Sequence, residues 1–148
     1  MPKYNKSQAI FSYDVPGGAL TANHAGIVSV GWGGERDNSE SGTLGTNQVK
    51  NAYTGKDAFK GEIMVAMDNS ANSAYQDFMT RFTDSTYVGL PFTIRIDAPD
   101  GAVGSDRIDQ EIKLTSMADV THDANSADEG QVKFGYTCDA SFSHTTIT

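Results

Sequence analysis

Side chains suited to acid, base or metal chemistry are few in this sequence and lie far apart along it. The three histidines are His24, His122 and His144. None of them has the His-x-x-x-His or Cys-His spacing that holds zinc in proteins. No nucleophile elbow is present, so a Ser-His-Asp site would have to assemble from distant positions. We therefore expect surface or loop histidines and predict no catalytic residue.

Two groups of acidic residues offer oxygen ligands of the kind that Ca²⁺ prefers. They are Asp97, Asp100, Asp106 and Asp109, and then Asp119, Asp123, Asp128 and Glu129. Neither group has the ligand spacing of an EF-hand loop. We expect solvated acidic turns at both places and predict no metal site.

Two glycine-containing stretches match nucleotide-binding motifs only in part. Gly55-Lys56 lacks the earlier glycine of a phosphate-binding loop, because Lys50 holds that position, and Asp57 follows instead of Ser or Thr. The stretch Gly31-Trp32-Gly33-Gly34 lacks the spacing of a dinucleotide fingerprint and precedes a polar segment instead of a helix. We expect a turn before a strand at Gly55-Lys56 and predict no cofactor.

Composition restricts the remaining classes of function. A chain of 148 residues is the size of one domain, and its formal net charge of −8 disfavours a sequence-specific nucleic-acid binder. Cys138 is the only cysteine, so we expect a reduced, buried thiol. The polar segment Met1 to Ile10 lacks the apolar core of a signal peptide, and no apolar stretch has the length of a membrane span. These features predict an intracellular origin and no membrane partner.

The strongest structural signal is a long period-two pattern near the end of the sequence. Apolar residues from Val132 to Phe142 alternate with polar or small residues from Lys133 to Ser143. Such alternation predicts a half-buried strand, which at about 3.3 Å per residue would reach roughly 40 Å. Its polar face either meets water, contacts another subunit or lines a lumen. A strand of this length needs long neighbours in a large antiparallel sheet or barrel.

Shorter runs of strand character precede it. We expect further strands at Gln8–Tyr13, Gly26–Trp32, Gln48–Tyr53, Phe59–Met67, Phe92–Asp97 and Ile108–Thr115. The run Phe59–Met67 is apolar on both faces, which predicts a central strand. The polar segments Gly33–Asn47 and Asp119–Gly130 read as long loops, the first of them alternatively a mobile hairpin tip.

One segment has helical spacing instead. Ala71, Tyr75, Phe78, Met79 and Phe82 recur with the period of a helix over residues 72–83. Ser73 and Gln76 have the spacing of a capping box. The fold class that follows is mainly β: an antiparallel β-sandwich or barrel over residues 1–148, with one amphipathic α-helix and a long polar loop.

This layout resembles the tail tube proteins of tailed bacteriophages and the related tube proteins of R-type pyocins and type VI secretion. The resemblance covers most of the chain and includes the style of its GQVKFGYTCDASF segment. It implies stacked hexameric rings around a channel that conducts DNA, in the tail of a virion assembled in the bacterial host cytoplasm. It also implies sheath, baseplate and tape-measure proteins as partners. A net acidic subunit would repel phosphate and let DNA slide.

The same resemblance suggests two sets of contact residues. The long loop at 33–47, with the N-terminal segment, would bridge subunits or rings, and the wall strand would line the lumen. The bridging candidates are Trp32, Glu35, Arg36, Asp37, Glu40 and Leu44, and the lumen or wall candidates are Thr137, Asp139, Ser141 and Ser143. Trp32 has two open readings, a cap on the core or an interface anchor.

Two other classes of function stay open on sequence grounds. A monomeric β-sandwich that binds carbohydrate would stack Trp32, Tyr53 or Tyr87 on a sugar. A small β-barrel enzyme would need a site dispersed over distant positions. A monomer that binds glycans and a protein that forms filaments are distinguishable by sizing and electron microscopy.

Overall fold

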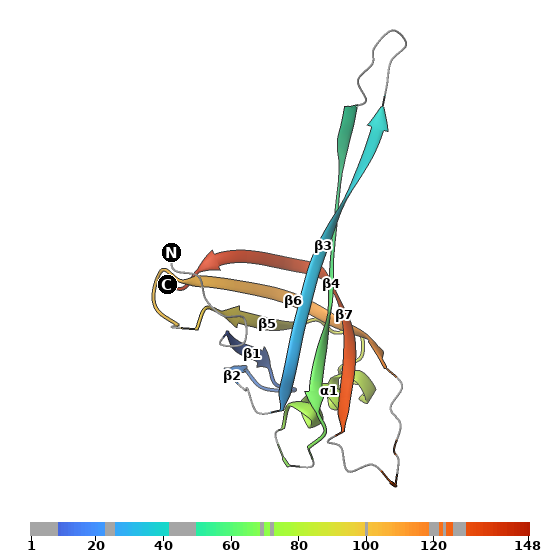
Figure 1. Ribbon diagram of the computed structural model, residues 1–148, viewed down its shortest axis with the longest axis vertical. Coiled ribbons are helices and arrows are strands. Elements are labelled where there is room, and N and C mark those ends of the chain that lie inside the picture. The colour runs from blue at the N-terminus through green and yellow to red at the C-terminus, as the bar shows by residue number, and fades with distance from the viewer. Residues whose placement is uncertain are drawn as a thin grey trace.

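The computed structural model describes residues 9–22, 26–41, 50–68, 70–71, 73–99, 101–118, 122, 124–125 and 130–148. Its strands form one antiparallel sheet in the order β2-β1-β5-β6-β7-β4-β3 (Figure 1). The elements are β1 (Ile10–Asp14), β2 (Leu20–Ala22), β3 (Ile27–Ser41), β4 (Lys50–Ala66), α1 (Ala74–Thr83), β5 (Phe92–Asp97), β6 (Asp106–Met117) and β7 (Gln131–Thr146). None of the described helices is long and apolar enough to cross a membrane.

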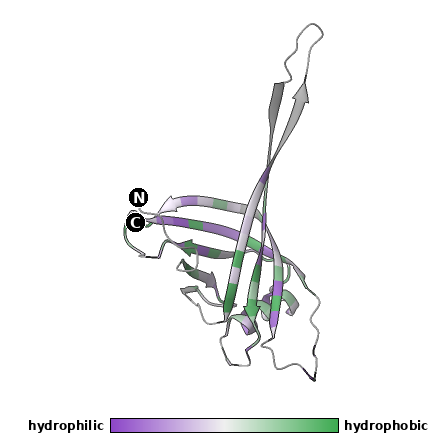
Figure 2. Ribbon diagram, viewed as in Figure 1, coloured by the Kyte–Doolittle hydropathy of each residue, from purple (hydrophilic) through white to green (hydrophobic). Residues whose placement is uncertain are grey.

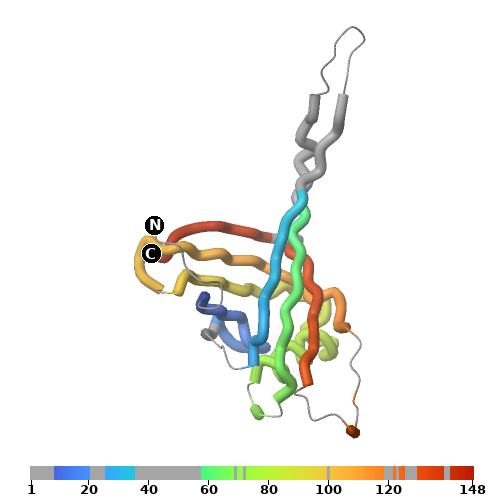
Figure 3. The backbone as a smooth tube through the Cα atoms, viewed as in Figure 1, coloured from blue at the N-terminus to red at the C-terminus, as the bar shows by residue number. Residues whose placement is uncertain are grey.

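The predicted long strand is confirmed as β7. Val132, Phe134, Tyr136 and Cys138 are buried on one face, and the residues between them are less covered. An irregularity opposite β6 follows, where Glu111 pairs with Ser141 but Lys113 pairs with Thr137. The Cys138 thiol donates a hydrogen bond to the Ser141 carbonyl across it, at 2.9 Å. β7 bends at this place (Figure 3), because extra residues in one strand of a pair increase its local twist.

The sheet curls around α1, and the core lies between them. The ring of Phe78 is fully buried and lies 5.1 Å from Tyr13, 6.0 Å from Phe92 and 5.9 Å from Phe134 between ring centroids. Those partners belong to β1, β5 and β7, which are not all adjacent in the sheet. One helical side chain can reach all three only if the sheet bends around it.

The predicted helix is confirmed, and its beginning differs slightly from the expectation. α1 begins at Ala74, with Ser73 as N-cap accepting a hydrogen bond from the Gln76 amide at 3.3 Å. The capping box is only half formed, because the Gln76 side chain donates to the Asp68 carbonyl and the Ser73 amide donates to the Ser70 carbonyl. The segment before the helix therefore folds back onto its first turn.

The prediction of a long loop from Gly33 is wrong for Gly33 to Ser41, which belong to β3, whereas the alternative of a hairpin agrees with the antiparallel pairing of β3 and β4. β3 pairs with β4 from Ile27↔Val65 to Ser41↔Lys50, so the two strands predicted at Gln48–Tyr53 and Phe59–Met67 are one strand. The turn predicted at Gly55-Lys56 is also wrong, since these residues lie within β4. Leu44 and the rest of 42–47 lie outside the described residues, as does most of Asp119–Gly130.

β4 has neighbours on both sides, as predicted for the run that is apolar on both faces. It pairs with β7 from Phe59 to Ala66 and with β3 along its length. The expected short strands also appear, with β1 at Ile10–Asp14 and β5 and β6 close to their predicted bounds. β2 was not expected from the sequence.

One buried amide stands out in the apolar core. Gln110 of β6 is 1% exposed, and neither its Nε2 nor its Oε1 has a hydrogen-bond partner. Its neighbours across the sheet are Ile94 and Phe142. The Tyr136 hydroxyl lies near the Gln110 amide but outside hydrogen-bond geometry with either of its polar atoms, and it donates to the Gly31 carbonyl at 3.2 Å instead. Gln110 thus carries the desolvation cost of an amide without a bond that offsets it.

Replacing Gln110 with methionine, which has a similar length and no amide, should stabilise the protein. We expect the free energy of unfolding to rise by about 1–3 kcal/mol in urea denaturation, the usual cost of an unpaired buried polar group. The matched control is Gln131→Met on the exposed first residue of β7, with an effect within about 0.5 kcal/mol. A clear loss of stability in Gln110→Met would contradict this account of the amide.

Candidate functional site

A two-stranded ribbon extends from the sheet where β3 and β4 leave β7 (Figure 1). β4 pairs with β7 only from Phe59 onward, so residues 35–41 of β3 and 50–58 of β4 pair only with each other. At about 3.4 Å per residue, the β3 part of this ribbon reaches roughly 25 Å. An isolated two-stranded ribbon is marginally stable in water, and its outer backbone edges are open to pairing.

Three aromatic rings support the base of the ribbon. Phe59 of β4 stacks on Phe142 of β7 at 4.2 Å between centroids, and Trp32 of β3 lies 5.5 Å from the same Phe142. Trp32 remains 45% exposed. The two readings of Trp32 are therefore compatible, because one part of the indole caps Phe142 and the rest is open to a partner.

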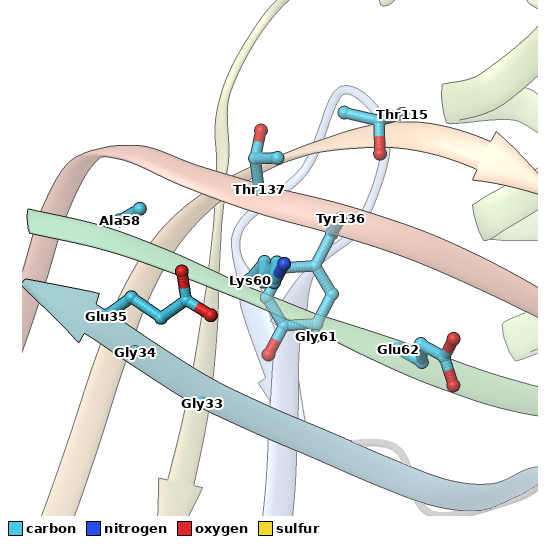
Figure 4. Close-up of a pocket in the computed structure, with 10 residues that line it drawn as sticks. All are labelled: Gly33, Gly34, Glu35, Ala58, Lys60, Gly61, Glu62, Thr115, Tyr136 and Thr137. Carbon is cyan, nitrogen blue, oxygen red and sulfur yellow. The ribbon is translucent and has the colours of Figure 1, made fainter.

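An open hollow of about 610 Å³ lies beside this base, between β3, β4, β6 and β7. Its floor contains Gly33, Gly34 and Gly61, and Glu35 lies at its side (Figure 4). The ring of Tyr136 lies across Gly61, where a Cβ would come within 2.6 Å of the Tyr136 hydroxyl. At Gly33 an added Cβ would meet no atom within 4 Å, so this position is open. The glycines are the only signal of this hollow in the sequence.

The Tyr136 hydroxyl connects β7 to β3 over Gly61. It donates a hydrogen bond to the Gly31 carbonyl at 3.2 Å. Burial raises the pKa of Tyr136 to about 12, with the nearby Gln110 acting in the opposite direction. The phenol therefore stays protonated at neutral pH and remains a donor.

The other bridging candidates follow the ribbon. Glu35 is exposed, and β3 contains the backbone of Arg36, Asp37 and Glu40. Leu44 lies outside the described residues. Sequence analysis assigned these candidates to a loop or hairpin tip, whereas the structure places Glu35, Arg36, Asp37 and Glu40 in strand β3.

Three of the wall candidates, Thr137, Ser141 and Ser143, lie on one polar face that β7 shares with β6. Register places Ser143 opposite Asp109 and Ser141 opposite Glu111, and Thr137 opposite Lys113. Ser141 is exposed, Thr137 and Ser143 are half-buried, and Asp139 lies at the irregular part of β7. Figure 2 shows hydrophilic and hydrophobic residues alternating along β6. Neighbouring residues of a strand point to opposite faces, so the polar residues lie on this face and the apolar residues on the core face.

The expectation of solvated acidic turns is wrong for part of the first acidic group. Asp97 lies in β5 and accepts two hydrogen bonds from Arg107, and Asp109 of β6 accepts two from Arg95. The hydrogen bond between Arg107 and Asp97 raises the pKa of the Arg107 guanidinium. Asp106 begins β6 and lies 2.8 Å from His144 Nε2.

The remaining candidates for acid, base or metal chemistry are dispersed. His122 is exposed, whereas His24, Asp100 and the second acidic group lie outside the described residues. No three His, Cys, Asp or Glu side chains gather as a metal site within the part of the chain that the structure describes. Tyr87, one candidate sugar platform, faces the Arg81 guanidinium at 5.6 Å.

Comparison with known proteins finds similarity in the fold but not in the sequence. No protein-family model matches this sequence, and no curated protein matches it. Among solved structures, a chain from the SPP1 tail tube superposes with a TM-score of 0.66 at 8% identity, covering 99% of this chain and 77% of that chain. A chain from the tail of an empty GTA particle with C6 symmetry superposes with a TM-score of 0.71 at 13% identity, covering 97% of this chain and 99% of that chain. The chain has a tail-tube fold.

A third structure agrees with this. A chain from the virion of a native gene transfer agent (GTA) particle has a TM-score of 0.65 at 12% identity, covering 97% of this chain and 99% of that chain. The tail-tube fold confirms the mainly β class predicted from the sequence and the resemblance drawn there. Because it spans nearly the whole chain, it includes the ribbon strands as well as the curled sheet.

Proposed function

We propose that this protein is a structural, non-enzymatic subunit of a phage tail tube, forming stacked hexameric rings around a channel for DNA. The observation that carries the proposal is the tail-tube fold, shared over 97% of the chain with a chain from a tail of C6 symmetry. Location in the virion follows from the same proposal. So do assembly in the host cytoplasm and contacts with sheath, baseplate and tape-measure proteins.

The ribbon supports this function because its two strands pair only with each other. The outer edge of each strand therefore has backbone N–H and C=O groups without a partner strand. Proteins that stay monomeric usually keep such edges short or covered. Contact with a neighbouring subunit or ring would cover the ribbon, with Glu35, Arg36, Asp37 and Glu40 of β3 as bridging residues. Leu44, outside the described residues, is a further candidate.

β7 offers a second incomplete edge. Its residues 131–138 lie between β4 and β6, whereas residues 141–146 pair with β6 alone. Trp32 and Phe142 lie beside the point where the neighbour on the β4 side is lost. Side-by-side copies in a closed ring would cover such edges, since ring closure leaves no free strand at either side.

Negative-stain electron microscopy of the concentrated protein tests this proposal. We expect rings or hollow filaments for the full chain. In a truncated variant, an Asn-Gly turn joins Glu35 directly to Ala58, which are opposite each other in the ribbon. Because β4 meets β7 only from Phe59, the truncation leaves the curled sheet intact, and we expect a folded protein that forms no filaments.

Two results would contradict the proposal. Persistent monomers of the full chain at every concentration, above all with measurable glycan binding, would favour the carbohydrate-binding class instead. Normal tubes from the truncated variant would exclude the ribbon as a bridge. Thermal unfolding of the truncated variant provides the control, since a transition close to that of the full chain shows that its sheet is intact.

A further inference from the structure

Four charged residues form a small lattice on the polar face of β5 and β6. Arg95 lies opposite Asp109, and Asp97 lies opposite Arg107. The sign of the charge therefore alternates along each strand and across the pair. Opposite charges in direct register attract, and an alternating lattice has no net charge of its own.

Each arginine is held by two hydrogen bonds from its guanidinium. Arg95 Nε and Nη2 donate to Asp109 Oδ1 and Oδ2 at 2.7 and 3.2 Å. Arg107 Nε and Nη2 donate to Asp97 Oδ1 and Oδ2 at 2.8 and 3.1 Å. The four side chains are 12–28% exposed, so the pairs are only partly screened by water.

This geometry is the one that an arginine uses for phosphate. The planar guanidinium binds a carboxylate or a phosphate through the same pair of parallel N–H···O bonds. An arginine whose Nε and Nη2 are already engaged with an aspartate cannot offer that edge to a nucleic acid. Asp97 and Asp109 thus occupy the positions that phosphate oxygens would take.

The lattice shares its face with the wall candidates of β7. Register connects Arg95 through Asp109 to Ser143, and Asp97 through Arg107 to Thr145. The rest of the row consists of hydroxyl side chains, which bind phosphate weakly compared with cations. Within these two rows, Arg95 and Arg107 are therefore the groups best suited to retain a nucleic acid, and Lys113 lies further along the same face, opposite Thr137.

We propose that Asp97 and Asp109 mask Arg95 and Arg107, so that these two arginines on the polar face of β5, β6 and β7 do not retain a nucleic acid that moves along it. The masking itself is a property of the single subunit. Its use in a channel rests on the function proposed above.

The test unmasks both arginines and measures DNA binding by the purified subunit. For Asp97→Asn with Asp109→Asn, we expect affinity for a fluorescent DNA duplex to rise about tenfold or more at low salt. The slope of log affinity against log salt should steepen by roughly 1.8, which corresponds to one phosphate for each freed arginine. The unchanged protein should show no measurable binding in fluorescence anisotropy.

The control gives the same change of charge without freeing an arginine. Glu35→Gln with Glu111→Gln also removes two carboxylates, and neither residue pairs with an arginine among the described ion pairs. Glu111 even lies on the same face. Equal DNA binding by this control and the unmasked variant would overturn the proposal, because net charge alone would then explain it.

A second variant keeps the proposal testable if the first unfolds. Exchanging Arg95 and Asp109, as Arg95→Asp with Asp109→Arg, restores the pair in reverse, and we expect it to fold and to bind no DNA. Strong DNA binding by this folded variant would contradict masking by the partner carboxylate.

Assembled particles separate this proposal from the function it rests on. If the unchanged protein forms no rings or filaments, this result contradicts the proposed tube function. The DNA-binding assay on the purified subunit still tests whether Asp97 and Asp109 mask the two arginines. Filaments of the unmasked variant should retain a short DNA strand in a nuclease-resistant form. Retained DNA that nuclease digests fully would place the lattice outside the channel and overturn its role there.

Discussion

Phe78→Ala is expected to lower the free energy of unfolding by about 3–5 kcal/mol, the usual cost of truncating a buried aromatic residue to alanine. The ring is fully buried and contacts rings from β1, β5 and β7. Its removal would leave a cavity at the point where the sheet curls around α1. Since most domains have a total stability of about 5–15 kcal/mol, urea denaturation should show a large shift of the midpoint.

Phe82→Ala is the matched control for this prediction. Phe82 lies one turn further along α1, is only half-buried, and contacts Phe134 edge-on at 6.1 Å. We expect less than half of the loss seen for Phe78→Ala. Equal losses for the two variants would mean that Phe78 does not connect the two sides of the curled sheet.

Gly61→Ala should destabilise the protein by about 3 kcal/mol, near the upper end of the usual cost of over-packing. A Cβ at this position would clash with the Gly31 carbonyl oxygen and would lie 2.8 Å from Tyr136 Cζ. The Gly31 carbonyl is backbone of a paired strand, so it cannot move aside without disturbing β3. The substitution also displaces the hydroxyl that connects β7 to β3.

The control for this substitution is Gly33→Ala, two residues further along β3 from Gly31. A Cβ there meets no atom within 4 Å, and the backbone is not in the left-handed region. Restricting the unfolded chain should make Gly33→Ala neutral or stabilising by up to about 1 kcal/mol. A loss of stability as large as that of Gly61→Ala would refute the steric explanation. Both variants should be measured by thermal and urea unfolding.

The core was predictable because its residues face in one direction. Val132, Phe134 and Tyr136 repeat with period two, and Phe78 and Phe82 repeat with the period of a helix. A buried face imposes such a period on the sequence, whichever fold contains it. The sequence therefore predicted β7 and α1 with nearly correct bounds.

The ribbon was missed for the converse reason. Residues Gly33 to Ser41 are almost all polar or glycine and show no alternation with apolar residues, so nothing in their sequence marks them as a strand. Their pairing with β4 supplies the structure instead, through backbone hydrogen bonds that any residue can make. A polar strand in a two-stranded ribbon looks like a loop when it is read alone.

The details of the candidate site depend on contacts between distant residues. Gly61 and Tyr136 meet only because β4 and β7 are neighbours in this register. Likewise, Asp97 and Asp109 appeared to be part of one acidic group, and only the pairing of β5 with β6 placed an arginine opposite each. Sequence reasoning named this face correctly as polar but could not show that Arg95 and Arg107 are paired with aspartates.

The position of β7 between β4 and β6 has a consequence for the time at which a subunit becomes able to assemble. β7 is synthesised after both of these neighbours, and it alone joins the part of the sheet that contains β3 and β4 to the part that contains β1, β5 and β6. While β7 is still within the ribosome, the two parts have no shared strand and the aromatic support of the ribbon lacks Phe142. Pairing over such long sequence separations is also slow compared with local folding. A nascent chain therefore cannot present a complete ribbon base or the open edge of β7, which delays association until translation has passed this strand.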